Sequence, residues 1–164
     1  MPFWPCYITE RANVGRTTFY DHFGSKEALL LSAHFAEVGD LVPEVFCVDD
    51  LLAEEAPDAL VKLFELMYQL RPFYIELVHG ADMALFQREV RVRNAERIEN
   101  SLRHAFREEN SKIPFPMLAN YLASAQIGFV YWWVESHAPY QAYEMAQAYQ
   151  RIQRAVLRDA LGLD

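Results

Sequence analysis

Residues 8–30 read ITERANVGRTTFYDHFGSKEALL, and this stretch decides how the N-terminal part of the chain is expected to fold. Residues 8–12 read as the end of a helix. Residues 13–15, Asn-Val-Gly, read as a tight turn, because Asn and Gly tolerate the left-handed backbone that such a turn often requires. A second helix is expected over residues 16–23 and a third from Lys26, so the pattern predicts a helix-turn-helix.

The second helix of this motif carries most of the side chains expected to reach DNA. Threonine hydroxyls can approach base edges or phosphates closely, while a tyrosine hydroxyl, a histidine nitrogen and a lysine amine suit phosphate oxygens. Val14, Phe19 and Phe23 are expected to form a small apolar core behind this helix, and Ser25 is expected to cap the third helix. The predicted DNA-contacting residues are Arg16, Thr17, Thr18, Tyr20, His22 and Lys26.

The remainder of the chain also reads as helical, because apolar residues recur at helical spacing without convincing period-2 alternation between turn residues. Helices are expected over residues 26–41, 57–70, 73–79, 81–109 (as one helix or two), 117–137 and 140–161. Residues 42–50 are expected to be a connection, Pro72 to break or kink a helix, and Gly162 to cap the last one. The helix over residues 117–137 has almost no polar face, so it is expected to be buried all round.

The composition describes a globular, acidic chain. It has 164 residues, 52% of them hydrophobic, which suffices for one well-cored domain or a small domain fused to a larger one. The net charge of −8 argues against a basic surface over the whole molecule, so any DNA contact must be local. Residues 1–39 carry three Lys or Arg against four Asp or Glu, which predicts weak long-range attraction to DNA.

Two further features of the sequence predict where in the cell the protein is found. Cys6 and Cys47 are far apart and form no CxxC motif, so a reduced cytoplasmic protein is the better expectation. No apolar run reaches the roughly 18 residues of a transmembrane span. Residues 1–7 are too short and too proline-rich for a signal peptide, so we expect no membrane partner.

The motif over residues 8–30 resembles the DNA-binding signature of the TetR family of transcriptional regulators. The residues that carry the resemblance are Ile8, Ala12, Asn13, Val14, Arg16, Thr18, Phe19, Tyr20, His22, Phe23, Ser25, Lys26, Glu27 and Leu29. The resemblance implies an all-α fold, with a helix-turn-helix DNA-binding region and connecting helix over residues 1–41. A helical-bundle domain for ligand binding and dimerisation would follow over residues 42–164. Family members place a first helix and most of a second before the position of Ile8, so we expect the DNA-binding domain to be incomplete at its N-terminus.

Aromatic side chains are concentrated between residues 64 and 149, where they could line a cavity between helices. The resemblance implies such a cavity in this domain, for an unidentified small-molecule effector that is mostly apolar or aromatic with a few polar anchors. The alternative is that these residues are plain core, because an aromatic stripe at helical spacing is more often packing than a binding site. The candidate ligand-binding residues are Tyr68, Tyr74, Met83, Phe86, Tyr121, Trp132 and Trp133.

The last two expected helices offer more apolar surface than one small domain can bury, and an exposed apolar patch of this kind marks an association site. In the TetR family these helices form a four-helix bundle across a two-fold axis, which places two recognition helices one DNA turn apart. The alternative is that both helices belong to the core of a single chain. The candidate dimer-interface residues are Leu118, Leu122, Phe129, Val130, Met145, Tyr149, Ile152 and Val156.

No residue pattern favours catalysis or a cofactor. The five histidines show neither HxxxH nor HExxH spacing, and there is no glycine-rich phosphate loop. We therefore predict a non-enzymatic, ligand-responsive regulator, most simply a repressor, that binds palindromic double-stranded DNA as a homodimer without a metal or other cofactor. The alternative is a dimeric small-molecule-binding module of the same ancestry that no longer binds DNA, which the incomplete motif and the balanced local charge favour.

Overall fold

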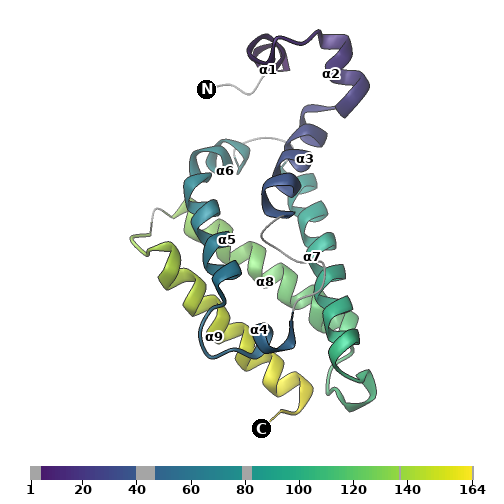
Figure 1. Cartoon of the computed structure of the whole chain (residues 1–164), viewed down its shortest axis with the longest axis vertical. Coiled ribbons are helices and arrows are strands. Elements are labelled where there is room, and N and C mark those ends of the chain that lie inside the picture. The colour runs from purple at the N-terminus through teal and green to yellow at the C-terminus, as the bar shows by residue number, and fades with distance from the viewer. Residues whose placement is uncertain (1–4, 40–46, 79–82, 137, 164) are drawn as a thin grey trace. The chain divides into compact units, whose positions relative to one another are not determined.

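The structure is a computed structural model. It describes residues 5–39, 47–78, 83–136 and 138–163. Within these ranges every regular element is a helix and there is no strand (Figure 1), so the all-α prediction is confirmed. None of the described helices combines the length and the apolar character needed to cross a membrane.

The chain divides into two compact units, and the N-terminal unit, Met1–Gly39, holds a helix-turn-helix. Helix α1 (Pro5–Ala12) leads into a turn, α2 (Arg16–Phe23) follows, and α3 (Lys26–Gly39) completes the described part of the unit. Asn13 in the turn has a φ of 53°, the left-handed conformation that its short polar side chain tolerates. Helix α2 begins and ends at the predicted residues.

The C-terminal unit, Asp40–Asp164, contains the remaining elements. They are α4 (Val48–Leu52), α5 (Asp58–Gln69), α6 (Arg71–Val78), α7 (Met83–Ala105), a 3-10 turn η1 (Glu108–Asn110), α8 (Phe115–Glu135) and α9 (Ala142–Leu161). The expectation of a plain connection over residues 42–50 is wrong from Val48 onward, where α4 begins. Leu70 separates α5 from α6, and Pro72 lies in the first turn of α6, where its missing N–H is tolerated.

The C-terminal unit is organised around α8, which lies between α7 and α9 (Figure 1). The inner face of α8 is buried and packs with apolar residues of both neighbours, including Leu102 of α7 and Leu157 of α9. Ala119 and Ala123 are fully buried on this face, and such small side chains let neighbouring helices approach closely. Each large apolar side chain buried here stabilises the fold by ~1.5–3 kcal/mol, so this face fixes the position of α8.

The outer face of α8 is open to solvent in the single chain. Met117, Tyr121 and Trp132 are 65%, 57% and 49% exposed. The expectation that this helix is buried all round is therefore wrong, because only one of its apolar faces meets other helices of the same chain.

Two polar side chains of α9 hold the C-terminal end of α4 and the residue that follows it. Gln150 is buried, and its Nε2 donates to the carbonyl oxygens of Asp50 at 2.9 Å and Ala53 at 3.1 Å. Arg154 donates from Nε to the carbonyl oxygen of Leu52 at 2.9 Å. These bonds satisfy carbonyls at the end of α4 that a helix of five residues cannot pair by itself.

Helix α9 has a capping signal at each end. At its start the Gln141 N–H donates to the Glu144 carboxylate at 2.8 Å as part of a capping box. At its end Gly162 takes the left-handed conformation, with a φ of 66° and a ψ of 34°, so the predicted C-cap is confirmed.

The Gln150→Met substitution should lower the free energy of unfolding by about 1–3 kcal/mol, because the carbonyls that Gln150 serves lose their buried partner. Urea unfolding followed by circular dichroism measures this loss. The matched control is Gln153→Met on the same helix, where the side chain is partly exposed and the loss should stay below about 0.5 kcal/mol. Equal losses in the two variants would contradict the role assigned to Gln150.

Candidate functional site

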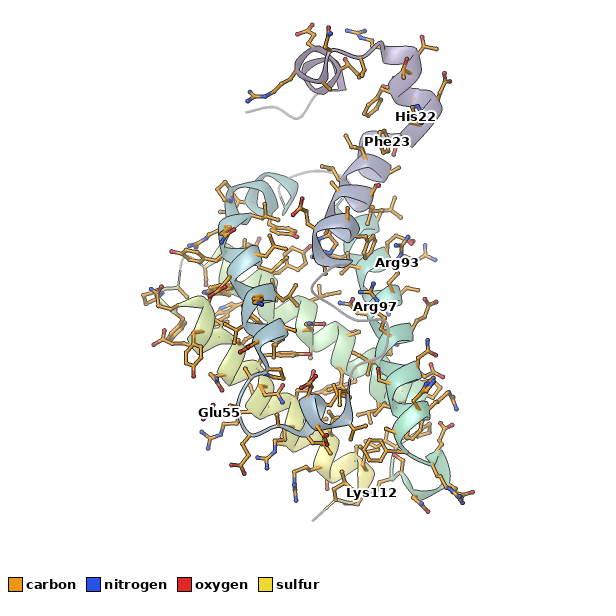
Figure 2. All side chains as sticks on the ribbon, viewed as in Figure 1. His22, Phe23, Glu55, Arg93, Arg97 and Lys112 are labelled. Atoms are coloured by element: carbon orange, nitrogen blue, oxygen red, sulfur yellow. The ribbon has the colours of Figure 1, made fainter. Side chains whose placement is uncertain are left out.

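Helix α2 presents one polar face and one buried aromatic edge. Phe19 is buried, and its ring centroid lies 5.9 Å from that of Phe23 and 5.2 Å from that of Tyr20, which meets it edge-on. Figure 2 shows His22 and Phe23 together at the end of this helix. These ring contacts lie within α2 itself, and Phe19 is the buried side chain of the helix, whereas its polar side chains remain exposed.

The predicted DNA-contacting side chains lie on the accessible part of α2. Those that the structure describes are exposed, namely Arg16, Thr17, Thr18, Tyr20 and His22. The side chain of Lys26 lies outside the described residues. The Ala28 N–H donates to the Ser25 hydroxyl oxygen at 3.1 Å, which confirms the predicted cap of α3, while the DNA-binding role of the α2 residues stays a prediction.

The turn before α2 is held by backbone hydrogen bonds. The Val14 N–H donates to the Thr9 carbonyl at 3.0 Å, and the Asn13 N–H donates to the Glu10 carbonyl at 3.2 Å. The Val14 side chain is 42% exposed, so the expectation that it fills the core between the helices is wrong. At the other end of α2, Gly24 has a φ of 65°, a conformation that favours glycine and turns the chain towards α3.

A cluster of aromatic rings fills the C-terminal unit around Phe64, which is fully buried. Its ring centroid lies 5.9 Å from that of Trp133, 6.0 Å from that of Tyr149 and 6.4 Å from that of Phe129. The half-exposed Tyr68 stacks on Trp133 at 5.7 Å. The Phe64 cluster is therefore packed core, and it contains residues predicted for the ligand site as well as residues predicted for the dimer interface.

A second aromatic group joins α6, α7 and α8. The buried Tyr74 ring lies 6.4 Å from that of Phe86 and 6.5 Å from that of Tyr131, and both contacts are edge-on. Burial raises the pKa of Tyr74 above its usual value of 10.0, and the neighbouring Tyr131 hydroxyl raises it further. Burial also raises the pKa of Tyr131. Both hydroxyls are therefore neutral at physiological pH, when each can donate one hydrogen bond and accept others.

The structure distributes the predicted ligand residues over several places. Trp133 and Tyr68 belong to the Phe64 cluster, whereas Tyr74 and Phe86 belong to the second aromatic group. The remaining three are Tyr121 and Trp132, which are exposed on α8, and Met83, whose side chain lies outside the described residues. The assignment of all seven to a ligand site stays a prediction.

Sequence reasoning missed Phe64 and Tyr131, although these residues complete the two aromatic groups. A signal for Phe64 was present, because it lies four residues before Tyr68 and so shares a face of α5 with it. No comparable signal marked Tyr131, since every face of α8 is rich in apolar residues.

The predicted dimer-interface residues differ in exposure. Leu118, Leu122, Met145 and Tyr149 are buried in the single chain, Phe129, Val130 and Val156 are partly buried, and Ile152 is 56% exposed. Other exposed large side chains on these two helices are Met117, Tyr121, Trp132 and Tyr143. A second copy of the chain could reach only the exposed side chains without rearranging the core.

The polar chemistry beside the second aromatic group comes from hydroxyls and one guanidinium. Arg71, the first residue of α6, donates from Nε to the carbonyl oxygen of Val134 at 3.0 Å. This contact places a cation at the C-terminal end of α8, where unpaired helix carbonyls favour positive charge. In the part of the chain that the structure describes, no group of His, Cys, Asp or Glu side chains is placed to hold a metal ion.

Comparison with known protein families gives two matches. A family model described as "Transcriptional regulator C-terminal region" matches residues 54–154, well over half of the chain. A second, described as "Bacterial regulatory proteins, tetR family", matches residues 7–33. No curated protein and no solved structure gives a significant match. The first match covers both aromatic groups, and the second covers the whole of α2.

The buried tyrosines should make the protein less stable in alkaline solution. Burial raises the pKa of Tyr74, Tyr131 and Tyr149 above the value in the unfolded chain, so the unfolded chain loses these protons first as the pH rises past about 10. Below that pH these three tyrosines should contribute no pH dependence to the free energy of unfolding. Above it, the free energy should fall by up to about 1.4 kcal/mol per pH unit for each buried tyrosine, as measured by urea unfolding at a series of pH values.

Two phenylalanine variants serve as controls for this titration. Tyr149→Phe removes one buried phenol and should make the alkaline slope shallower. Tyr143→Phe makes the same chemical change at an exposed position of α9 and should leave the slope unchanged. A free energy of unfolding that does not vary with pH in this range would contradict the prediction.

Proposed function

Because the chain belongs to the TetR family of transcriptional regulators, we propose that it is a repressor that binds a palindromic operator as a homodimer and leaves it when a small molecule binds the C-terminal unit. The observation that carries the proposal is the exposed polar face of α2, anchored by the buried Phe19. A short helix held in this way can enter the major groove with its hydroxyl side chains towards base edges and phosphates.

Short-range hydrogen bonds have to supply most of the affinity for DNA. Arg16 and Tyr20 lie one turn apart on α2, both are exposed, and both can donate to phosphate oxygens. The threonines between them have short side chains that suit close approach to base edges. Because the N-terminal unit carries three positive against four negative residues, few counterions would be released, so the affinity should depend only modestly on salt.

The exposed apolar side chains of α8 and α9 support a homodimer. Tyr121 and Ile152 are both more than half exposed in a single chain, and stable homodimers bury side chains of this kind. An interface between two identical copies is two-fold symmetric, and a two-fold dimer reads a palindromic site. The outer faces of these helices are therefore our candidate for the contact between copies.

The effector would act by favouring one of two states of the dimer. A ligand shifts such an equilibrium only if it binds the two states with different affinity. The second aromatic group, around Tyr74, suits this role, because it combines apolar rings with two neutral hydroxyls at the junction of three helices.

A second candidate function is a dimeric module that binds a small molecule but not DNA. The near-neutral charge of the N-terminal unit favours this alternative, because most DNA-binding surfaces are basic. Failure of the wild-type protein to bind any duplex in the experiment below would support it.

Tyr20→Phe should weaken operator binding by roughly five- to tenfold, because it removes one hydroxyl hydrogen bond and keeps the ring. Fluorescence anisotropy on duplexes from the DNA upstream of the gene measures the affinity, with a random duplex as the baseline. Tyr140→Phe is the matched control, since it makes the same change at an exposed position outside the helices proposed for the dimer contact and should leave the affinity unchanged. Equal affinities of Tyr20→Phe and wild type would count against the assigned role of α2.

The double substitution Tyr121→Asp with Ile152→Asp should convert the dimer to a monomer, because a symmetric interface would bury four uncompensated carboxylates. Light scattering coupled to size-exclusion chromatography measures the mass. Leu85→Asp is the control, since it places the same charge at an exposed position of α7. A wild-type protein that is already monomeric, or a double variant that stays dimeric, would refute this interface.

A further inference from the structure

Two buried side-chain nitrogens have no hydrogen-bond partner in the part of the chain that the structure describes, Arg71 Nη2 and Arg97 Nη1. Such atoms are costly, because a charged donor loses its water without gaining an acceptor. Arg97 projects from the middle of α7, as Figure 2 shows. Arg71 lies one helical turn from the second aromatic group, so aromatic rings and two tyrosine hydroxyls lie near its unpaired nitrogen. We therefore consider Arg71 further.

The structural role of Arg71 uses only part of its guanidinium. Its Nε donates to the Val134 carbonyl at 3.0 Å, which pairs a carbonyl in the last turn of α8. A guanidinium has five N–H donors in a fixed fork, and the paired edges of that fork match the two oxygens of a carboxylate. The contact with Val134 therefore fixes the fork in place while Nη2 remains without an acceptor.

Two tyrosine hydroxyls belong to the same helix–helix contact. Tyr74 follows Arg71 by one turn on α6, and Tyr131 precedes Val134 by one turn on α8. The rings of these tyrosines meet at 6.5 Å, so α6 and α8 touch at two levels that are about one helical turn, ~5 Å, apart. One level offers a cation, and the other offers aromatic surface with neutral hydroxyls.

We propose that Arg71 is the anchor for the carboxylate of the effector, a small organic acid whose apolar body packs against Tyr74, Tyr131 and Phe86. This inference rests on the proposed function, since it gives a chemical class to the ligand of the C-terminal unit. A carboxylate supplies the acceptor that Arg71 Nη2 lacks, and an aromatic or aliphatic body matches the rings one turn away.

Other ligand classes fit these residues less well. A cation would meet Arg71 with like charge, and a neutral amide or alcohol would leave the guanidinium, whose Nη2 is buried, without a counter-charge. A phosphate monoester carries up to two negative charges and would need more donors than one guanidinium and two hydroxyls provide. A singly charged acid is therefore the class that these side chains favour.

Phenylacetate and its neutral isostere phenylacetamide test the proposal. The acid should bind wild-type protein at least about tenfold more tightly than the amide in ligand-observed NMR titrations, because only the acid neutralises Arg71. Arg71→Met should remove this preference, and Arg71→Lys should reduce it, since lysine keeps the charge but loses the paired donors.

Arg154→Met is the matched control variant. Arg154 also donates from Nε to a backbone carbonyl, that of Leu52 at 2.9 Å, but its Nη2 is already paired with Glu54 at 3.2 Å. The preference for the acid should persist in this variant. If Arg71→Met does not fold, the preference for the acid over the amide in wild type, and its reduction in Arg71→Lys, still test the proposal.

The proposal is overturned by equal binding of acid and amide, by no binding of either, or by a preference that survives in Arg71→Met. Equal binding would mean that water satisfies the Arg71 nitrogen. Because the titration contains no DNA, its outcome is separate from that of the operator experiment. If the protein prefers the acid but binds no operator, the acid-binding site is supported and the repressor function is contradicted. If it binds the operator but shows no preference for the acid, the repressor function is supported and the acid-binding site is contradicted.

Discussion

The packing of α8 against α7 and α9 is the constraint on which the C-terminal unit depends. One face of α8 is buried with Leu102 and Leu157 on its neighbours, and the small Ala119 and Ala123 allow the helices to approach closely. The same helix carries Tyr121 and Trp132 on its open face. The helix that builds the core of this unit therefore also carries, on its opposite face, exposed apolar side chains that we propose for the contact between copies.

The parts of the fold that local chemistry determines could be predicted from the sequence. Asn13 permits the left-handed backbone in the turn before α2, and Ser25 and Gly162 cap helices through neighbouring backbone groups. Helix α4 could not be predicted in this way. It has only five residues, and the carbonyls at its end are paired by Gln150, which lies 100 positions from Asp50 in the sequence. A contact of that range leaves no local signal.

The candidate sites were less predictable than the fold, because a helix without a polar face does not mark which side is inward. Trp132 and Trp133 are adjacent in sequence, yet the first is half exposed and the second is buried with its indole N–H donating to the Tyr140 carbonyl at 3.0 Å. The candidate role of Arg71 could not be predicted from the sequence. Arg71 reads as an ordinary charged residue at a helix start, and its partner carbonyl on Val134 lies 63 positions away.

Selectivity at the junction of α6 and α8 would come from desolvation as much as from attraction. The guanidinium of Arg71 is held by the Val134 carbonyl, and the phenols of Tyr74 and Tyr131 are neutral hydroxyls whose pKa burial raises further. A ligand that neutralises the cation gains a short charge-assisted contact, while an amide isostere can accept a hydrogen bond from the same nitrogen but leaves the cation without a counter-charge. An acid and its neutral isostere make the same apolar contacts, so the missing counter-charge decides the difference in affinity. Arg71 can therefore distinguish an acid from a neutral molecule of the same shape.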